Sequence, residues 1–363
     1  MEIYDLAIVG GGPAGSSCAA FSSIKGLRTI VLERDKFPRE KVCGDCINPA
    51  CWPILRRLGL DEHVRAAPHS VLSWVEFINA HGRQLRLELP RGQNPEIAIK
   101  RSIFDSILLK HAGERGAETR EVTMLRAIER TGDRAAGAAA WQIAAGEEKF
   151  LARFIVAADG RNSTVARLLG LLPRVKRERV ALQAHVRLPA DFGNRVILQL
   201  LPGGYSGQVP VNERELNVCL VGRAASLPQL RQWAGERFAL SPQQQWRTIT
   251  PLTRTSISPA RENLFLIGDA ARVVEPFTGE GIFYALNSGE IAAEMIHRLV
   301  RGANPVLVRQ EFRRAHTAMY QGRLWINALA RATVVSPKIG STLFQVGRIQ
   351  PGLLRFLTSK IIG

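Results

Sequence analysis

The sequence lacks any apolar run long enough to cross a membrane. A membrane-spanning helix needs roughly 18 consecutive apolar residues, and no stretch of these 363 residues reaches that length. The first expected strand starts close to Met1, which leaves no room for a secretory signal peptide ahead of it. We therefore expect a cytoplasmic location, with the protein either free or bound peripherally to the inner face of the membrane.

Cysteines are scarce, and their number is odd. The five cysteines, in a chain without a secretion signal, argue against a disulfide framework. Two of them form the motif Cys43-x-x-Cys46, which has three interpretations. It could be a redox dithiol, or half of a zinc site for which no second CxxC supplies the missing ligands. The interpretation we favour is a tight loop whose thiols do no chemistry.

The sequence shows no cluster of metal ligands and no nucleophile, base and acid in a catalytic arrangement. His185 alternates with apolar neighbours, a pattern more typical of a structural or pocket-lining residue than of a general base. The only candidates for catalytic chemistry are therefore Cys43, Cys46 and His185, and no metal is expected.

Acidic residues are almost missing from the last part of the chain, residues 301–363. This region has ten basic residues and a single acid, Glu311, in a protein of net charge +17. Bulky apolar residues such as Trp325 and Phe356 are interleaved with the charges, a composition that suits an anionic membrane surface. The alternative, slightly favoured, is a solvated helical face with a buried stripe. No recognition motif accompanies the charge, so a nucleic-acid partner is not expected.

The strongest positive signal lies in the first 33 residues. The motif Gly10-x-Gly12-x-x-Gly15 stands between an expected strand, 6–9, and a helix, 16–24, and the next strand ends on Glu33, 18 residues past Gly15. The glycines permit a tight turn and close approach to a pyrophosphate, and the acid can accept from ribose hydroxyls. The alternative is a turn that binds nothing. The predicted dinucleotide-binding residues are Gly10, Gly12, Pro13, Ala14, Gly15, Glu33 and Arg34.

The middle of the chain predicts a second, antiparallel sheet. Alternation such as Leu85, Leu87 and Leu89 against charged neighbours is typical of a half-exposed sheet. The expected helices outside it include 49–58, 101–115, 164–169 and 227–238. The strands expected in this region are 71–79, 84–89, 96–100, 180–188, 195–201, 207–211 and 216–221. Strands expected in the dinucleotide-binding part of the chain, besides those at its motifs, are 121–130, 141–145 and 150–157.

Two further strands end on acids. Phe154–Ala158 leads into Asp159-Gly160, and Leu264–Ile267 leads into Gly268-Asp269. Either carboxylate could reach a cofactor, although Asp159 could instead belong to an Asx turn. A second anion-facing helix N-terminus is expected at 282, after a glycine-rich segment. The candidate residues there are Gly268, Asp269, Pro276, Gly279, Gly281 and Ile282.

Together, the three motifs resemble the FAD-binding set of the para-hydroxybenzoate hydroxylase superfamily. The loop from Phe37 to Asp45, and the segment from Gly268 to Gly289, are similar to those of the geranylgeranyl reductase family. The resemblance implies FAD, with Glu33 at the adenosine ribose, Asp269 at the middle of the cofactor and Arg101 against it. Cys43, Gly44 and the segment from Pro276 to Ile282 would lie near the flavin ring.

The resemblance also implies an α/β fold, α+β overall. A Rossmann-like FAD-binding domain (1–70, 100–170 and 255–300) would carry an inserted antiparallel-sheet substrate domain (71–99 and 171–254) and a helical, basic C-terminal region (301–363).

The family's chemistry suggests reduction of carbon–carbon double bonds in an isoprenoid, lipid or quinone-type substrate, a small apolar molecule. NAD(P)H or another reductant would supply the electrons. One alternative is a monooxygenase that hydroxylates an aromatic or polyketide-like ring, and another is a non-catalytic flavoprotein at a membrane surface. A disulfide reductase would need a second GxGxxG, and the sequence contains none. The oligomeric state is left open.

Overall fold

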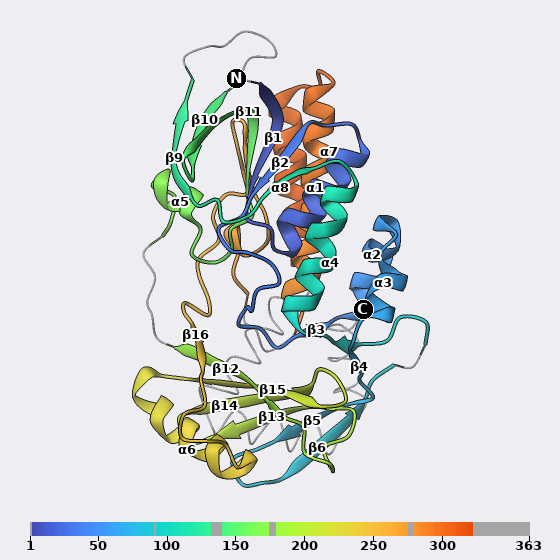
Figure 1. The fold of residues 1–363 in the computed structure, drawn as a ribbon, viewed down its shortest axis with the longest axis vertical. Helices are drawn as coiled ribbons and strands as arrows, with labels where there is room; N and C mark the ends of the chain where they lie inside the picture. Colours follow the sequence, from blue (N-terminus) through green and yellow to red (C-terminus); the bar gives the residue numbers. More distant parts are fainter. Residues whose placement is uncertain (1, 91, 132–139, 174–178, 275–278, 322–363) are drawn as a thin grey trace.

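The computed structural model describes residues 2–90, 92–131, 140–173, 179–274 and 279–321 (Figure 1). Its largest sheet has a parallel centre in the order β18-β11-β1-β2-β8, with β17 antiparallel at one edge. The inner strands β1, β2, β11 and β18 are largely apolar and the sheet is covered on both faces there, which is why most of their sequence runs continuously rather than alternates. The strands are β1 (Ile3–Val9), β2 (Thr29–Leu32), β8 (Glu118–Arg120), β11 (Glu148–Ala157), β17 (Ala260–Arg261) and β18 (Leu264–Leu266).

One face of this sheet is covered by helices α1 (Pro13–Ile24), α4 (Arg101–Glu114), α7 (Gly281–Val300) and α8 (Pro305–Ala318) (Figure 1). Small residues let α1 pack closely between its neighbours, and its Ser17 hydroxyl donates to the carbonyl of Leu286 on α7. The opposite face carries β9 (Leu125–Arg130), β10 (Trp141–Ala145) and α5 (Thr164–Leu168), whose apolar side chains form a second core cluster with β1.

A second, seven-stranded sheet has the order β16-β12-β15-β14-β13-β5-β6 and is antiparallel except between β13 and β5. Helix α6 (Leu227–Phe238) packs on one of its faces. The strands are β5 (Trp74–Ile78), β6 (Gln84–Glu88), β12 (Val180–Arg187), β13 (Arg195–Leu201), β14 (Gly204–Pro210), β15 (Glu215–Gly222) and β16 (Arg247–Ile249).

A three-stranded sheet of β3 (Cys46–Ile47), β7 (Ile97–Ala98) and β4 (Ser70–Val71) lies between the two larger sheets (Figure 1). The predicted strand over 96–100 is therefore too long, because only Ile97 and Ala98 of that stretch pair with other strands. Helices α2 (Trp52–Leu58) and α3 (Asp61–Ala66) lie between β3 and β4 in the chain. Short 3-10 turns occur at Pro49–Cys51, Ala224–Ser226 and Gly268–Ala270.

The predicted strand over 121–130 is also wrong in its first half. Val122 adopts a left-handed backbone conformation with φ of 55°, which is strained for a β-branched residue and ends any ladder there. Only the second half of the segment forms a strand, β9, which pairs antiparallel with β10, while β8, which pairs parallel with β2, already ends at Arg120.

The predicted fold class is confirmed as α/β, with a Rossmann-like parallel sheet and a second antiparallel sheet. The stated domain boundaries stay a prediction. No helix among the described residues is long and apolar enough to cross a bilayer. Of the basic region 301–363, residues 322–363 lie outside the described residues.

Candidate functional site

The glycine motif forms a turn that requires glycine at positions 10 and 15. Gly10 has φ of +104°, and a Cβ there would lie 2.6 Å from the carbonyl oxygen of Ala158. A Cβ on Gly15 would lie 1.8 Å from the carbonyl oxygen of Gly10. Helix α1 then begins at Pro13, and among the described residues no side chain caps it at Gly12. Its first N–H groups are thus free to bind an anion.

Glu33 is fixed beside this turn, at the end of β2. Its Oε2 accepts from the N–H of Gly11 at 2.7 Å, and its Oε1 accepts from the N–H of Asp35 at 2.9 Å. The side chain is only 5% exposed. The carboxylate is therefore held rigidly, and it lines a cavity together with Arg34.

The two other predicted acids line the same cavity but are held differently. Asp159 Oδ2 accepts from the N–H groups of Thr164 and Val165 at 2.6 and 3.1 Å, so this carboxylate caps α5, and burial raises its pKa. Asp269 Oδ2 accepts from Nη2 of Arg161 at 3.1 Å. Both acids are therefore brought to one edge of the sheet, where parallel strands end.

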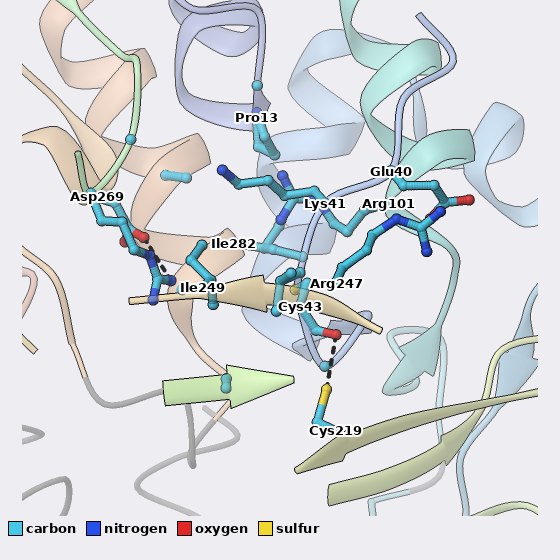
Figure 2. A pocket seen from close by; sticks show the side chains of 18 of the residues that line it. Pro13, Glu40, Lys41, Cys43, Arg101, Cys219, Arg247, Ile249, Asp269 and Ile282 are labelled. Atoms are coloured by element: carbon cyan, nitrogen blue, oxygen red, sulfur yellow. Dashed lines mark hydrogen bonds and ion pairs between the residues drawn. The ribbon is translucent and has the colours of Figure 1, made fainter. Parts of the chain in front are cut away.

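Positive side chains gather on the cavity wall near α1. The guanidinium of Arg101 is bidentate to the buried carboxylate of Asp105, with both distances 2.7 Å, and Arg39 Nη1 lies 3.0 Å from Asp105 Oδ2. Burial, and then the repulsion of Arg101, Arg39 and Arg161, lowers the pKa of Lys41 to about 8. Figure 2 shows Lys41 and Arg101 between Pro13 and Cys43. Sequence reasoning found Arg101 but missed Arg39, Lys41 and Arg161.

The cysteines of the CxxC motif also line the cavity, together with Cys219. All are free thiols. The Sγ of Cys219 donates to the carbonyl oxygen of Cys43 at 3.3 Å (Figure 2). Burial raises the pKa of Cys43 and raises that of Cys46 well above its usual value. A reactive dithiol needs a lowered pKa, so this environment favours a loop with inert thiols.

His185 lies behind the cavity wall rather than in it. Its Nε2 is 2.8 Å from Oδ2 of the fully buried Asp45, and Nδ2 of Asn217 donates to the same oxygen at 2.7 Å. Asp45 has φ of 59° and follows Gly44 in the cavity loop. The histidine and the amide thus hold the loop that carries Cys43.

The predicted residues near α7 divide into two groups. Gly279, Gly281 and Ile282 line the cavity. Gly268 stands behind the wall, where its N–H donates to the hydroxyl of Ser288 at 3.0 Å. Pro276 lies outside the described residues.

One cavity of about 670 Å³ connects all these groups to the second sheet. That volume is in the range typical of cofactor and ligand sites. On the far side from α1, most of its wall is apolar and comes from β5, β13, β14, β15, β16 and the segments after β6 and β16, although Gln208, Asn217, Arg247 and Thr248 also line it. The apolar residues there are Val75, Phe77, Leu89, Val196, Leu198, Tyr205, Val209, Val221, Ile249 and Leu252.

A family model described as "FAD binding domain" matches residues 4–199, more than half of the chain. The chain belongs to this FAD-binding family. It is an FAD-dependent oxidoreductase, as the resemblance predicted.

Two of the named relatives are reductases, in agreement with this assignment. A menaquinone reductase from Mycolicibacterium smegmatis is 30% identical over 80% of this chain and 76% of its own length. A digeranylgeranylglycerophospholipid reductase from Methanocella arvoryzae is 28% identical, covering 83% of this chain and 79% of the relative. Conditioned medium factor receptor 1 from Dictyostelium discoideum is 27% identical over 80% of this chain, which spans only 63% of that protein.

Solved structures share the fold at lower identity. The myxobacterial chondrochloren halogenase CndH superposes with a TM-score of 0.77 and 22% identity, over 91% of this chain and 82% of its own. PqsL from Pseudomonas aeruginosa, described as a probable FAD-dependent monooxygenase, gives a TM-score of 0.77 and 19% identity, over 95% of this chain and all of its own. These similarities establish the fold of the FAD-dependent oxidoreductase, not its reaction.

The residues present fit FAD. The free N–H groups of α1 and the cations Arg39, Lys41 and Arg101 suit a pyrophosphate. Glu33 offers fixed carboxylate oxygens for a ribose, and the Nε of Arg161 is buried without a partner among the described residues. When bound, FAD supplies hydride chemistry, while the protein supplies position and electrostatics.

Replacing Glu33 by Gln is expected to weaken FAD binding by about 10- to 100-fold, because one or two hydrogen bonds to a charged acceptor are lost. FAD titration followed by flavin fluorescence measures the effect. Glu2→Gln is the control, because Glu2 is exposed and does not line the cavity. Equal affinities for the Glu33 variant and the wild type would contradict the role given to Glu33.

Proposed function

We propose that this FAD-dependent oxidoreductase reduces carbon–carbon double bonds in the isoprenoid chain of a quinone or lipid. The observation that carries the proposal is the cavity, whose wall joins the FAD-binding turn to the apolar face of the second sheet. An extended apolar chain could lie along that face with one double bond next to the cofactor. The similarity to proteins named menaquinone reductase and digeranylgeranylglycerophospholipid reductase supports this substrate class.

The chain's own residues would contribute binding, orientation and exclusion of water. Phe77, Leu198 and Tyr205 offer apolar surface to an isoprenoid, and burying it drives binding. Gly279 and Gly281 present no side chain where a flat ring must approach the backbone. An external reductant of the NAD(P)H class would resupply the electrons.

The test is an anaerobic reaction of the FAD-loaded protein with excess dithionite and menaquinone. After reoxidation of the quinone ring in air, mass spectrometry is expected to show side chains heavier by two hydrogens per reduced double bond. A reaction without protein is the control, because dithionite reduces the ring but not the side chain. Unchanged side chains on menaquinone and on a geranylgeranyl phospholipid would refute the proposal. An aerobic product that gained oxygen would instead indicate a monooxygenase.

We further propose that the basic region 301–363 holds the protein on an anionic membrane, where such substrates reside. The apolar Val306 and Leu307 of α8 are 52% and 61% exposed, next to the basic Arg309. The aromatic ring of Phe312 packs on Phe265 in the core, so a chain cut at Val300 would lose part of that core.

A chain ending at Gln321 retains α8 and removes six of the ten basic residues of the region, those from Arg323 to Lys360, without removing an acid. It is expected to float less than the full chain with vesicles that contain anionic phospholipid, and flotation of both chains should vanish with neutral vesicles. Equal flotation of the two chains would show that residues 322–363 do not carry membrane binding.

A further inference from the structure

Glu96 is an acid inside the apolar part of the cavity. It lines the cavity wall immediately before β7, and its carbonyl oxygen accepts from the N–H of Leu72 at 2.9 Å. Leu72 belongs to a buried apolar cluster that includes Leu89, Val209 and, from β7, Ala98. Cys46, Val75 and Val196 pack against this cluster and line the cavity too. The Glu96 carboxyl therefore stands in surroundings that suit a hydrocarbon chain.

The carboxyl of Glu96 differs from the other acids of the site. Glu33 accepts from backbone N–H groups, Asp269 is paired with Arg161, and Glu215 is paired with Lys100 at 3.0 Å. For the side chain of Glu96, the described residues provide neither a hydrogen bond nor an ion pair. Burial raises its pKa to about 7, and its charge in turn raises the pKa of the thiols of Cys46 and Cys51. Near neutral pH it thus carries a proton for part of the time.

The position of Glu96 connects it to the cofactor side of the cavity. Cys46 is the shared neighbour: it interacts electrostatically with Glu96, and its Cβ is 3.8 Å from where a Cβ of Gly279 would stand. Gly279, Gly281 and Ile282 belong to the wall expected to face the flavin ring. His185 has no such access, because it is bonded to Asp45 behind the wall.

We infer that Glu96 is the catalytic acid that delivers a proton to the double bond during reduction; this rests on the proposed function. Reduction of an alkene requires a hydride on one carbon and a proton on the other. The O–H bond of Glu96 and the π bond break as one carbon takes the proton and forms the first C–H bond. The positive charge that develops on the other carbon would be met by a hydride from reduced FAD, which would return to its oxidised form and be reduced again by the external reductant. The carboxylate regains its proton from water.

The test compares the wild type with Glu96→Gln, which keeps the size of the side chain but cannot donate its proton as an acid. Reduced, anaerobic, FAD-loaded protein is mixed with menaquinone, and the return of oxidised FAD absorbance, matched to side-chain saturation, gives the rate. We expect Glu96→Gln to slow the reaction by at least about 100-fold at unchanged FAD content. The wild-type rate should fall as pH rises through about 7, and the rate of the variant should not. Glu62→Gln, on the exposed face of α3, is the control and should match the wild type.

A second readout does not depend on turnover. Infrared difference spectra of the FAD-loaded protein across a pH titration should show a protonated carboxyl band that is lost near pH 7 and is missing from Glu96→Gln. If the wild type saturates the side chain and the variant does so within about threefold of its rate, the assignment of Glu96 is wrong and the proposed function stands. If the wild type saturates no isoprenoid chain, the proposed function fails, and the role of Glu96 fails with it.

Discussion

Gly12→Ala is expected to weaken FAD binding by about 10- to 100-fold, because the added methyl group intrudes where the backbone must approach the pyrophosphate. The fold itself should tolerate the change. Gly12 has φ of −72° and ψ of −176°, which alanine adopts readily. The nearest atom to its Cβ would be the flexible Nη2 of Arg39, at 3.5 Å. Titration of the apo-protein with FAD, beside a thermal unfolding curve, separates binding from stability.

The matched control is Gly113→Ala, a change of the same size in the exposed part of α4. Its Cβ would meet only the side chain of Thr119, at 3.9 Å. Alanine favours a helix over glycine by about 0.5–1 kcal/mol, so this variant should bind FAD normally and unfold at a slightly higher temperature. An apo-protein of Gly12→Ala that binds FAD as tightly as the wild type would contradict the placement of the pyrophosphate at α1.

Asp105→Asn is expected to lower the free energy of unfolding by about 3–5 kcal/mol, because it leaves the buried guanidinium of Arg101 without its counter-ion and removes the nearer carboxylate partner of the half-buried Arg39. The carboxylate of Asp105 is fully buried and binds Arg101 through two 2.7 Å contacts and Arg39 through one of 3.0 Å. Urea unfolding of the apo-protein measures the loss. FAD affinity should fall as well, because both arginines that line the cavity lose their orientation.

Glu114→Gln provides the comparison on the same helix. Glu114 pairs with Lys110 at 3.7 Å on the solvent side, where both side chains are exposed. Exposed pairs contribute about 0–1 kcal/mol, so this variant should unfold like the wild type. If Asp105→Asn were as stable as the wild type, the buried ionic cluster would not hold the loop and helix together.

The sequence predicted the FAD site because its parts are local. The turn from Gly10 to Gly15 places a strand end, a helix start and its glycines within a few residues, so spacing alone identifies it. Asp159 and Asp269 could be predicted because each follows an apolar strand, and the carboxyl ends of parallel strands meet at one edge.

Other parts of the site depend on packing between distant segments. Arg39 and Lys41 stand in a loop without periodicity, and their role appears only when the loop lies against Asp105 and α1. Glu96 looked like an ordinary strand residue, and its apolar surroundings arise where the small sheet meets the second sheet. The strand break at Val122 was equally hidden, since a valine carries no turn signal.

The central claim is that one cavity holds FAD and an isoprenoid chain together, and a single-turnover measurement tests it most directly. The FAD-loaded protein is reduced without oxygen, freed of excess reductant and mixed with menaquinone, and both oxidised FAD and side-chain saturation are quantified. The account predicts one saturated double bond for each FAD that is reoxidised. FAD that stays reduced until air is admitted, or that is reoxidised with no saturated side chain, would contradict it.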